Sequence, residues 1–159
     1  MSGTLFVVAT PIGNLEDITL RAIRTLKDVD LIACEDTRHT RKLLAHYEIS
    51  KPLTSYFEHN QRVKSAALIR ELQEGKNIAL VSDAGTPGIS DPGGQLNQLL
   101  TTNYSLPTNI VPIPGPCALT TALSISGFPT DHFVFMGFPP HKKHRKQYFE
   151  KVAQCQETV

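Results

Sequence analysis

Short apolar runs alternate with stretches in which apolar residues recur every three or four positions. The runs predict buried β-strands, which are expected at residues 5–9, 31–34, 53–57, 78–81 and 110–111. The stretches predict amphipathic helices, which are expected around residues 18–26, 37–44, 63–72, 96–100 and 118–125. Strands that alternate with helices of this length are typical of parallel βαβ units. Residues 1–127 are therefore expected to form one doubly wound α/β domain with a mostly parallel sheet, whose strand order does not follow from the sequence.

Polar residues stand at the expected starts of several helices. Asp17, Asp36 and Asn60 precede the first three helices, and side chains of these types cap helix N-termini. Asp91 stands before Pro92, and proline is favoured at the first helical position. These residues are expected to set where the helices begin.

Three of the predicted strands run into loops rich in glycine or proline. The longest loop is Ser82–Gly94 (SDAGTPGISDPGG), which holds four of the ten glycines, and the others are Thr10–Asn14 (TPIGN) and Pro112–Pro116 (PIPGP). Glycine lets a ligand lie against the main chain, and ligands of open α/β sheets bind where loops leave the carboxyl ends of the strands. A binding site is therefore expected at these loops, the alternative being tight loops with no ligand.

A new pattern begins after Gly127 and stops at Val159. It consists of a predicted strand at residues 132–138 followed by a basic helix. These roughly 30 residues are too few to bury a core, because domains usually contain about 50 residues or more. Residues 128–159 are therefore expected to be the incomplete start of a second α/β domain.

The composition is that of a soluble domain, with 159 residues of which 40% are hydrophobic and 19% charged. The sequence contains neither a signal peptide nor a long apolar span, so a cytoplasmic location and no membrane partner are expected. Cys34, Cys117 and Cys155 lie far apart, which favours reduced thiols over a disulfide or zinc framework. The six histidines show no HExxH spacing, so no metal is expected.

The net charge of +1 gives no overall signal for nucleic acid, so an RNA partner would require local basic clusters. One such run at residues 141–146 contains Lys142, Lys143, Arg145 and Lys146, just before the last predicted helix. Each cation at a helix N-terminus destabilises the helix by roughly a few tenths of a kcal/mol, because it is repelled by the helix dipole, unless an anion compensates. A contact with RNA and a solvated basic face both remain open.

Two common nucleotide-binding motifs are missing from the sequence. A dinucleotide-binding oxidoreductase requires GxGxxG after the first strand, where this chain has TPIGN with one glycine. No run of the form GxxxxGK[ST] occurs, which argues against a P-loop phosphotransferase.

Five motifs follow one another along essentially the whole chain. They are TPIGN from Thr10, CEDTR from Cys34, SDAGTPGISDPG from Ser82, PGP from Pro114 and FMGFPP from Phe135. Together they resemble the ribosomal RNA small subunit methyltransferase I family, a branch of the tetrapyrrole-methylase-like, class III methyltransferases. The resemblance implies two α/β domains with S-adenosylmethionine between them. The chain departs from the family by ending where the second domain should continue for roughly another hundred residues.

The same resemblance implies a reaction and partners. The reaction is methylation of the ribose 2′-oxygen of a cytidine in small-subunit (16S) ribosomal RNA. The implied partners are this RNA or the 30S subunit, and a second copy of the chain in a homodimer.

S-adenosylmethionine carries a sulfonium cation, a carboxylate and an adenosine. Its site therefore needs close backbone approach, hydrogen-bond donors and nearby oxygen atoms. The glycine-rich and proline-rich loops and the helix after them supply the candidate cofactor-binding residues Pro11, Asp83, Gly85, Thr86, Ile89, Gly115 and Ala118. The alternative for Asp83 is a carboxylate that caps its own turn.

Methyl transfer is an in-line displacement at carbon, so the protein mainly has to align the acceptor oxygen with the methyl group. A protonated ribose hydroxyl is a poor nucleophile, and Glu35, Asp36 and the adjacent Arg38 are the catalytic candidates for removing its proton or positioning the nucleotide. Arg38 and Arg41 can also hold RNA phosphates. The alternative is a capping cluster in which Asp36 starts a helix and its arginines are solvated.

Two other functions remain open at this point. One is methylation of a ring carbon in a tetrapyrrole of the precorrin or uroporphyrinogen type, and the other is a cofactor-binding fragment without catalysis. A cofactor that lies between two domains needs both walls, so this chain alone is expected to have little or no activity.

Overall fold

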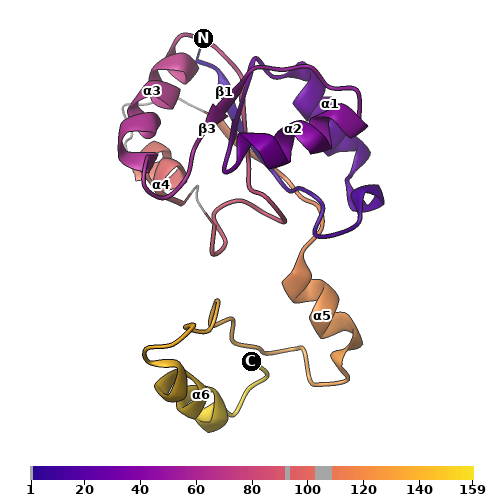
Figure 1. Cartoon of the computed structure of the whole chain (residues 1–159), viewed down its shortest axis with the longest axis vertical. Coiled ribbons are helices and arrows are strands. Elements are labelled where there is room, and N and C mark those ends of the chain that lie inside the picture. Colours follow the sequence, from indigo (N-terminus) through magenta and orange to yellow (C-terminus); the bar gives the residue numbers. More distant parts are fainter. Residues whose placement is uncertain (1, 92–93, 103–108) are drawn as a thin grey trace. The chain divides into compact units, whose positions relative to one another are not determined.

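The computed structural model describes residues 2–91, 94–102 and 109–159. Contacts divide the chain into two compact units, Met1–Cys117 and Ala118–Val159. The first unit is a layered α/β structure, and the second holds two helices joined by long loops (Figure 1). Helix α5 (Ala118–Ser126) groups with the second unit, whereas the domain boundary expected after residue 127 stays a prediction.

The first unit is built on five parallel strands in the order β3-β2-β4-β1-β5. The strands are β1 (Thr4–Val8), β2 (Leu31–Cys34), β3 (Leu53–Ser55), β4 (Ile78–Val81) and β5 (Asn109–Ile113). In the register of the sheet, Leu5 pairs with Ile78 on one side and Ile110 on the other. The prediction of a parallel α/β fold is confirmed.

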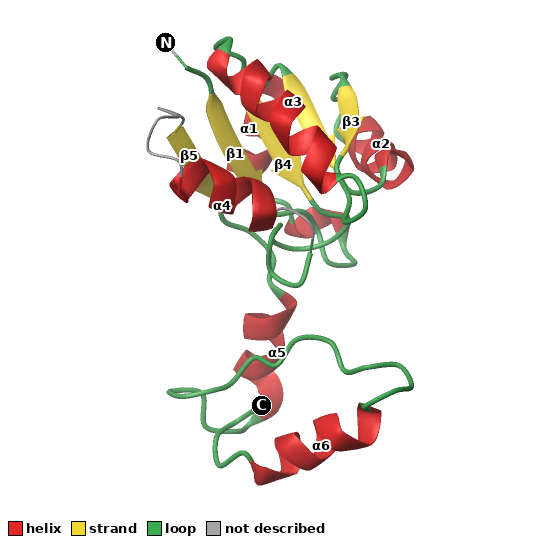
Figure 2. Ribbon diagram, turned by 90° about the vertical axis from the view of Figure 1, so that its left-hand side faces the viewer, coloured by secondary structure: helices red, strands yellow, loops and turns green. Residues whose placement is uncertain are grey.

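Helices cover both faces of this sheet (Figure 2). Helices α1 (Leu20–Asp28) and α2 (Thr37–His46) lie on one face, and α3 (Gln61–Gln73) and α4 (Gly94–Thr102) lie on the other. Alternate residues of a strand point to opposite faces, so each strand of a doubly wound sheet supplies two cores. Ile78 and Leu80 of β4 belong to the core under α3 and α4, whereas Ala79 and Val81 belong to the core under α1 and α2.

The helix starts agree with the sequence only in part. Thr19, and not Asp17, caps α1, because its hydroxyl accepts a hydrogen bond from the N–H of Ala22 at 3.1 Å. Asp17 lies instead in a short 3-10 helix, η1 (Leu15–Asp17), which precedes α1. Asp36 caps α2 as predicted, accepting from the N–H of Arg38 at 2.8 Å.

The third and fourth helix starts differ from simple caps as well. Asn60 stands at the start of α3, but its side-chain oxygen accepts from the N–H of Phe57 at 2.9 Å, which is a turn contact outside the helix. The expected start of α4 at Asp91 and Pro92 includes residues outside the described ranges.

The second unit contains α5 and α6 (Arg145–Gln154). The strand predicted at residues 132–138 is wrong, because only Phe133 forms a bridge, with Thr158. A strand is stable only when its backbone groups pair with a neighbouring strand, and the described part of this unit offers Phe133 no sheet. These apolar residues therefore lie in a loop, in which Phe135 and Phe138 are exposed.

Candidate functional site

All five strands are parallel, so their carboxyl ends lie at one edge of the sheet, called here the carboxyl edge. The loops that leave these ends gather there (Figure 2). Helices that follow neighbouring strands β1, β4 and β2 go to opposite faces, which opens crevices between their loops. The carboxyl edge is therefore where the fold itself favours a ligand.

The loops after β1 and β4 are joined by main-chain hydrogen bonds. The N–H of Thr10 donates to the carbonyl of Gly85 at 2.9 Å, and the N–H of Gly85 donates to the carbonyl of Thr10 at 3.1 Å. The hydroxyl of Thr10 also donates to the carbonyl of Ser82 at 3.1 Å. Gly85 has a φ of +76°, which favours glycine, so the backbone of this junction requires the residue even without a ligand.

The loop after β5 lies close against the end of β1. A Cβ atom on Gly115 would lie 3.0 Å from the Cβ of Ala9, so a larger residue at this position would force a neighbour to move. The N–H of Ala9 donates to the carbonyl of Ile113 at 3.1 Å. Gly115 thus has a packing role, and its contact with a cofactor stays a prediction.

Asp83 connects the loop after β4 to the end of β2. One oxygen of its carboxylate accepts a hydrogen bond from the N–H of Asp36 at 3.1 Å. The contact spans two neighbouring strands, so it is more than a turn cap of the kind considered for Asp83 alone. It fixes the backbone beside Glu35, which is half-buried.

The carboxylates around this contact affect one another. Burial, together with the negative charge of Asp83, raises the pKa of Glu35 above its ordinary value. Burial and Asp83 raise the pKa of Asp91 in the same way. Hydrogen bonds from the side chain and backbone of Arg38 hold the pKa of Asp36 well below its usual range. The site therefore combines one carboxylate whose pKa is lowered with two whose pKa values are raised.

Two pockets open at the carboxyl edge. The first, called the Thr10 pocket, has a volume of about 370 Å³ and is lined by Thr10, Pro11, Ile12, Gly13, Leu15, His39, Lys42, Leu43, Asp83 and Ala84. The second, called the Phe57 pocket, has a volume of about 610 Å³ and is lined by Glu35, Phe57, Glu58, His59, Gln61, Ser90 and Asp91. Both volumes fall in the range of about 300–1,000 Å³ that is common for ligand sites.

The structure brings together three of the seven predicted cofactor-binding residues. Pro11 and Asp83 line the Thr10 pocket, and Gly85 lies beside them. Thr86 is half-buried and Ile89 is exposed, both on the loop after β4. Ala118 opens α5 in the second unit, so the first unit does not contain it.

Among the predicted catalytic residues, Glu35 lines the Phe57 pocket. Asp36 caps α2, which was the alternative to a catalytic role, and its side chain also forms an ion pair with Arg38 at 2.8 Å. Arg38 and Arg41 lie on the exposed side of α2. The catalytic and phosphate-binding roles of these residues stay predictions.

Several residues of the two pockets were not predicted from the sequence. His39 and Lys42 face the Thr10 pocket because they lie three positions apart on α2, after the CEDTR motif. Phe57 and His59 face the other pocket from the loop after β3, and the strand predicted at residues 53–57 had included Phe57. The position of this loop beside β2 depends on the strand order, which the sequence does not reveal.

The predicted RNA-binding residues Lys142, Lys143, Arg145 and Lys146 are all exposed in the second unit. Arg145 donates to the carbonyl of Pro140 at 3.1 Å and lies 5.0 Å from the ring centre of Phe149. Lys146 is 3.8 Å from the carboxylate of Glu150. Arg145 and Lys146 therefore already have partners within the unit.

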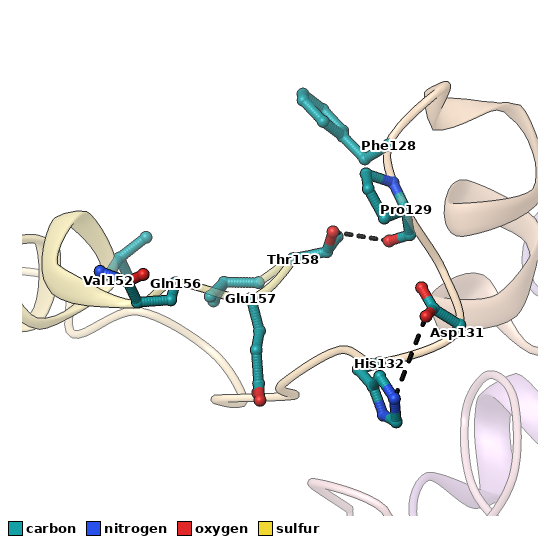
Figure 3. A pocket seen from close by; sticks show the side chains of 9 residues that line it. Phe128, Pro129, Asp131, His132, Val152, Gln156, Glu157 and Thr158 are labelled. Atoms are coloured by element: carbon teal, nitrogen blue, oxygen red, sulfur yellow. Dashed lines mark hydrogen bonds and ion pairs between the residues drawn. The ribbon is translucent and has the colours of Figure 1, made fainter.

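A further pocket of about 500 Å³ lies within the second unit (Figure 3). Thr158 donates to the carbonyl of Pro129 at 2.6 Å, and His132 lies 4.0 Å from Asp131. None of the predicted site residues lines this pocket, and Phe128 at its margin is largely exposed.

The described residues contain no group of three or more histidine, cysteine, aspartate or glutamate side chains that could hold a metal ion. None of the three cysteines forms a disulfide, and burial raises the pKa of the Cys34 thiol. Of the helices that the structure describes, none is long and apolar enough to cross a membrane.

Curated relatives of this chain are named ribosomal RNA small subunit methyltransferase I. The relative from Halalkalibacterium halodurans is 52% identical over 99% of this chain and 54% of its own length. Those from Bacillus subtilis and Escherichia coli O157:H7 are 51% and 54% identical over 99% and 88% of this chain, and 53% and 48% of their own lengths. The chain thus spans about half the length of the curated relatives it matches.

Solved structures and a family model agree on the fold. The chain resembles a uroporphyrin-III C-methyltransferase from Thermus thermophilus with a TM-score of 0.60 and 25% identity, covering 83% of this chain and 56% of that one. It also resembles the fold of a putative cobalamin-synthesis-related protein from Corynebacterium diphtheriae, with a TM-score of 0.63, 17% identity and coverage of 84% and 63%. The model of the tetrapyrrole (corrin/porphyrin) methylases matches residues 4–159. The chain therefore belongs to the tetrapyrrole (corrin/porphyrin) methylase family.

Proposed function

We propose that this chain forms the cofactor-binding and acceptor-binding part of an S-adenosylmethionine-dependent enzyme, which methylates the ribose 2′-oxygen of a cytidine in small-subunit ribosomal RNA. The observation that carries the proposal is the identity of about half of all residues, along nearly the whole chain, with relatives named for that RNA. The carboxyl edge, with its joined loops, supports it independently.

The cofactor is held, in this proposal, against the junction of Thr10 and Gly85. The residues there suit its chemistry. The carboxylate of Asp83 and the nearby main-chain oxygens can face the sulfonium cation, and Ile12 supplies apolar contact. Lys42 can pair with the carboxylate of the cofactor, and Thr86, Ile89, Gly115 and Ala118 are the further candidates from the loops and α5.

When bound, the cofactor supplies the methyl group, and the chain's own residues prepare the acceptor. Glu35 accepts the proton of the ribose hydroxyl. Its raised pKa makes it a stronger base than an ordinary exposed carboxylate. Asp36 and Arg38 position the Glu35 carboxylate, because Asp36 forms hydrogen bonds with both Asp83 and Arg38. Arg41, exposed on α2, holds a neighbouring phosphate.

The RNA partner, in the 30S subunit, also contacts the exposed residues Lys142, Lys143, Arg145 and Lys146. Such a localised contact is required because the net charge of +1 provides little overall attraction. We further propose that the protein is a homodimer located in the cytoplasm. Residues 128–159 are, in this proposal, the start of a second α/β domain.

Methylation of a tetrapyrrole ring carbon is the second candidate. It is favoured by the structural likeness to the uroporphyrin-III C-methyltransferase. That structure shares 25% sequence identity with this chain, whereas the relatives named for ribosomal RNA share about 50%. We therefore propose RNA, and not a tetrapyrrole, as the substrate.

A methyl-transfer assay tests the proposal. This chain is joined to the C-terminal half of the Bacillus subtilis relative, and the chimera and the chain alone are incubated with labelled S-adenosylmethionine and 30S subunits. We expect label on the ribose of one cytidine with the chimera, and at least about 100-fold less with the chain alone, because the proposed site is shared with the half of the relatives' length that this chain does not span. Label on a base, or on uroporphyrinogen but not on RNA, would contradict the proposal.

A further inference from the structure

We infer that the Phe57 pocket receives the base of the acceptor nucleotide and selects a pyrimidine that carries an exocyclic amino group. This inference rests on the proposed function and adds to it the subsite that chooses the base.

The location of the pocket suits a base attached to a reacting ribose. It lies among the loops after β2, β3 and β4, and Glu35 belongs both to its lining and to the neighbourhood of Asp83. A nucleotide whose ribose lies at Glu35 can therefore place its base in the Phe57 pocket, because Glu35 lines that pocket. The volume of about 610 Å³ is ample for a single pyrimidine nucleoside.

The pocket has an aromatic wall that is held in place before any ligand binds. The N–H of Phe57 donates to the side-chain oxygen of Asn60 at 2.9 Å, and the amide nitrogen of Asn60 donates to the carbonyl of Ser55 at 3.2 Å. The rings of Phe57 and His59 meet edge to face, with centres 6.3 Å apart. Proteins commonly bind an unstacked base by stacking it on such a ring, so the wall offers the contact that a splayed-out nucleotide needs.

The lining of the pocket also carries negative charge. Glu35, Glu58 and Asp91 line the pocket, and among its described lining residues there is neither lysine nor arginine. Carboxylates accept hydrogen bonds from the N4 amino group of cytosine, whereas uracil presents the O4 oxygen at the same position. The pocket therefore favours cytosine over uracil, and Gln61 can satisfy the remaining acceptors of the cytosine ring through its amide N–H groups.

The same charge excludes phosphate from the pocket. Anionic phosphates are repelled by three carboxylates, so the RNA backbone must lie outside, where Arg38 and Arg41 are exposed on α2. A nucleoside without phosphate is consequently the correct probe for the subsite.

The test measures binding of cytidine, uridine and guanosine to this chain by NMR titration, with S-adenosylmethionine titrated separately. We expect cytidine to bind at least about tenfold more tightly than uridine, as one good base contact allows. Asp91→Asn and Glu58→Gln should reduce this preference, and Phe57→Leu should weaken all pyrimidine binding. Glu74→Gln is the control, since Glu74 is an exposed glutamate that follows α3 away from the pocket.

Equal binding of cytidine and uridine, tighter binding of guanosine, or a preference unchanged in both Asp91→Asn and Glu58→Gln would overturn the inference. Thermal unfolding of each variant separates loss of the subsite from loss of the fold. If the nucleosides are not distinguished while the chimera still methylates ribosomal RNA, the inference fails and the proposed function stands. If the chimera labels no RNA, the proposed function itself fails.

Discussion

The carboxylate of Asp83 accepts a hydrogen bond from the main-chain N–H of Asp36 across 3.1 Å, and this contact joins the loops that leave two neighbouring strands. The same carboxylate contributes to the raised pKa of Glu35. Asp83 therefore acts on the candidate base both through the backbone and through its charge.

Asp83→Asn should separate these two effects. Asparagine retains an oxygen that can accept from Asp36, but it has no charge, so the pKa of Glu35 should fall toward its ordinary value. Carbon-detected NMR of the Glu35 carboxyl group during a pH titration measures this pKa. Asp83→Ala is the comparison, since it also removes the hydrogen bond and should disturb the amide signals of the loop at residues 35–37. An unchanged pKa in Asp83→Asn would show that burial alone controls Glu35.

Gly85 and Ala84 should respond differently to a larger side chain. The φ of +76° at Gly85 and its paired backbone make Gly85→Val primarily a folding mutation. Gly85→Ala should lower the free energy of unfolding by about 1–2 kcal/mol, the cost of left-handed backbone for a residue with a Cβ. Thermal or urea unfolding measures this.

Ala84→Leu is the matched variant for the ligand. Ala84 is exposed and lines the Thr10 pocket, so the larger side chain should leave stability nearly unchanged. It should weaken S-adenosylmethionine binding at least about tenfold, because the leucine side chain would occupy part of the Thr10 pocket and the cofactor would lose its contacts there. Calorimetric titration gives the affinity, and full affinity in a folded Ala84→Leu protein would remove the Thr10 pocket from the account.

Glu35→Gln should make the fold more stable at neutral pH. The pKa of Glu35 is raised in the folded state, so its contribution to stability is fully present below the ordinary value of 4.5 and is lost as the pH rises through the folded value. The variant should therefore gain stability relative to the unmodified chain between pH 4 and pH 7. Urea unfolding at several pH values measures this difference, and an offset independent of pH would disagree with the burial of a charged carboxylate.

The basic residues should differ in their effect on RNA binding. Lys142 and Lys143 precede α6, whereas Arg145 and Lys146 already contact Pro140 and Glu150. Replacing Lys142 and Lys143 by glutamine in the chimera should lower the slope of binding against salt concentration by about 1–2, because each phosphate contact contributes about 0.9. S-adenosylmethionine affinity should not change. If the slope is unaltered, these residues form a solvated face, and Arg38→Gln with Arg41→Gln becomes the informative variant.

The fold of the first unit followed from the sequence because its central strands β1, β2 and β4 are largely buried. All four residues of β4 are buried, so the strand appears as a continuous apolar run bounded by polar residues. The strand predicted at residues 132–138 has a similar pattern without a neighbour to pair with, and local pattern cannot distinguish the two cases.

The site was predictable only where a motif follows a strand directly. Pro11 and Asp83 were found because loops rich in glycine and proline mark the carboxyl edge. Phe57, His59 and Asp91 meet Glu35 only because β3 and β4 flank β2, and this order is a property of the folded sheet. The hydrogen bond between Asp83 and Asp36 likewise joins residues that are 47 positions apart in the sequence.

An NMR titration of this chain with S-adenosylmethionine, following the assigned backbone amides, tests whether the carboxyl edge binds the cofactor. We expect saturable shifts centred on residues 10–14, 82–91 and 114–117, with smaller changes at residues 35–37 through the Asp83 contact. Shifts confined to the second unit, or to the opposite edge of the sheet at residues 75–77, would contradict this expectation, as would the absence of saturable binding by the folded chain.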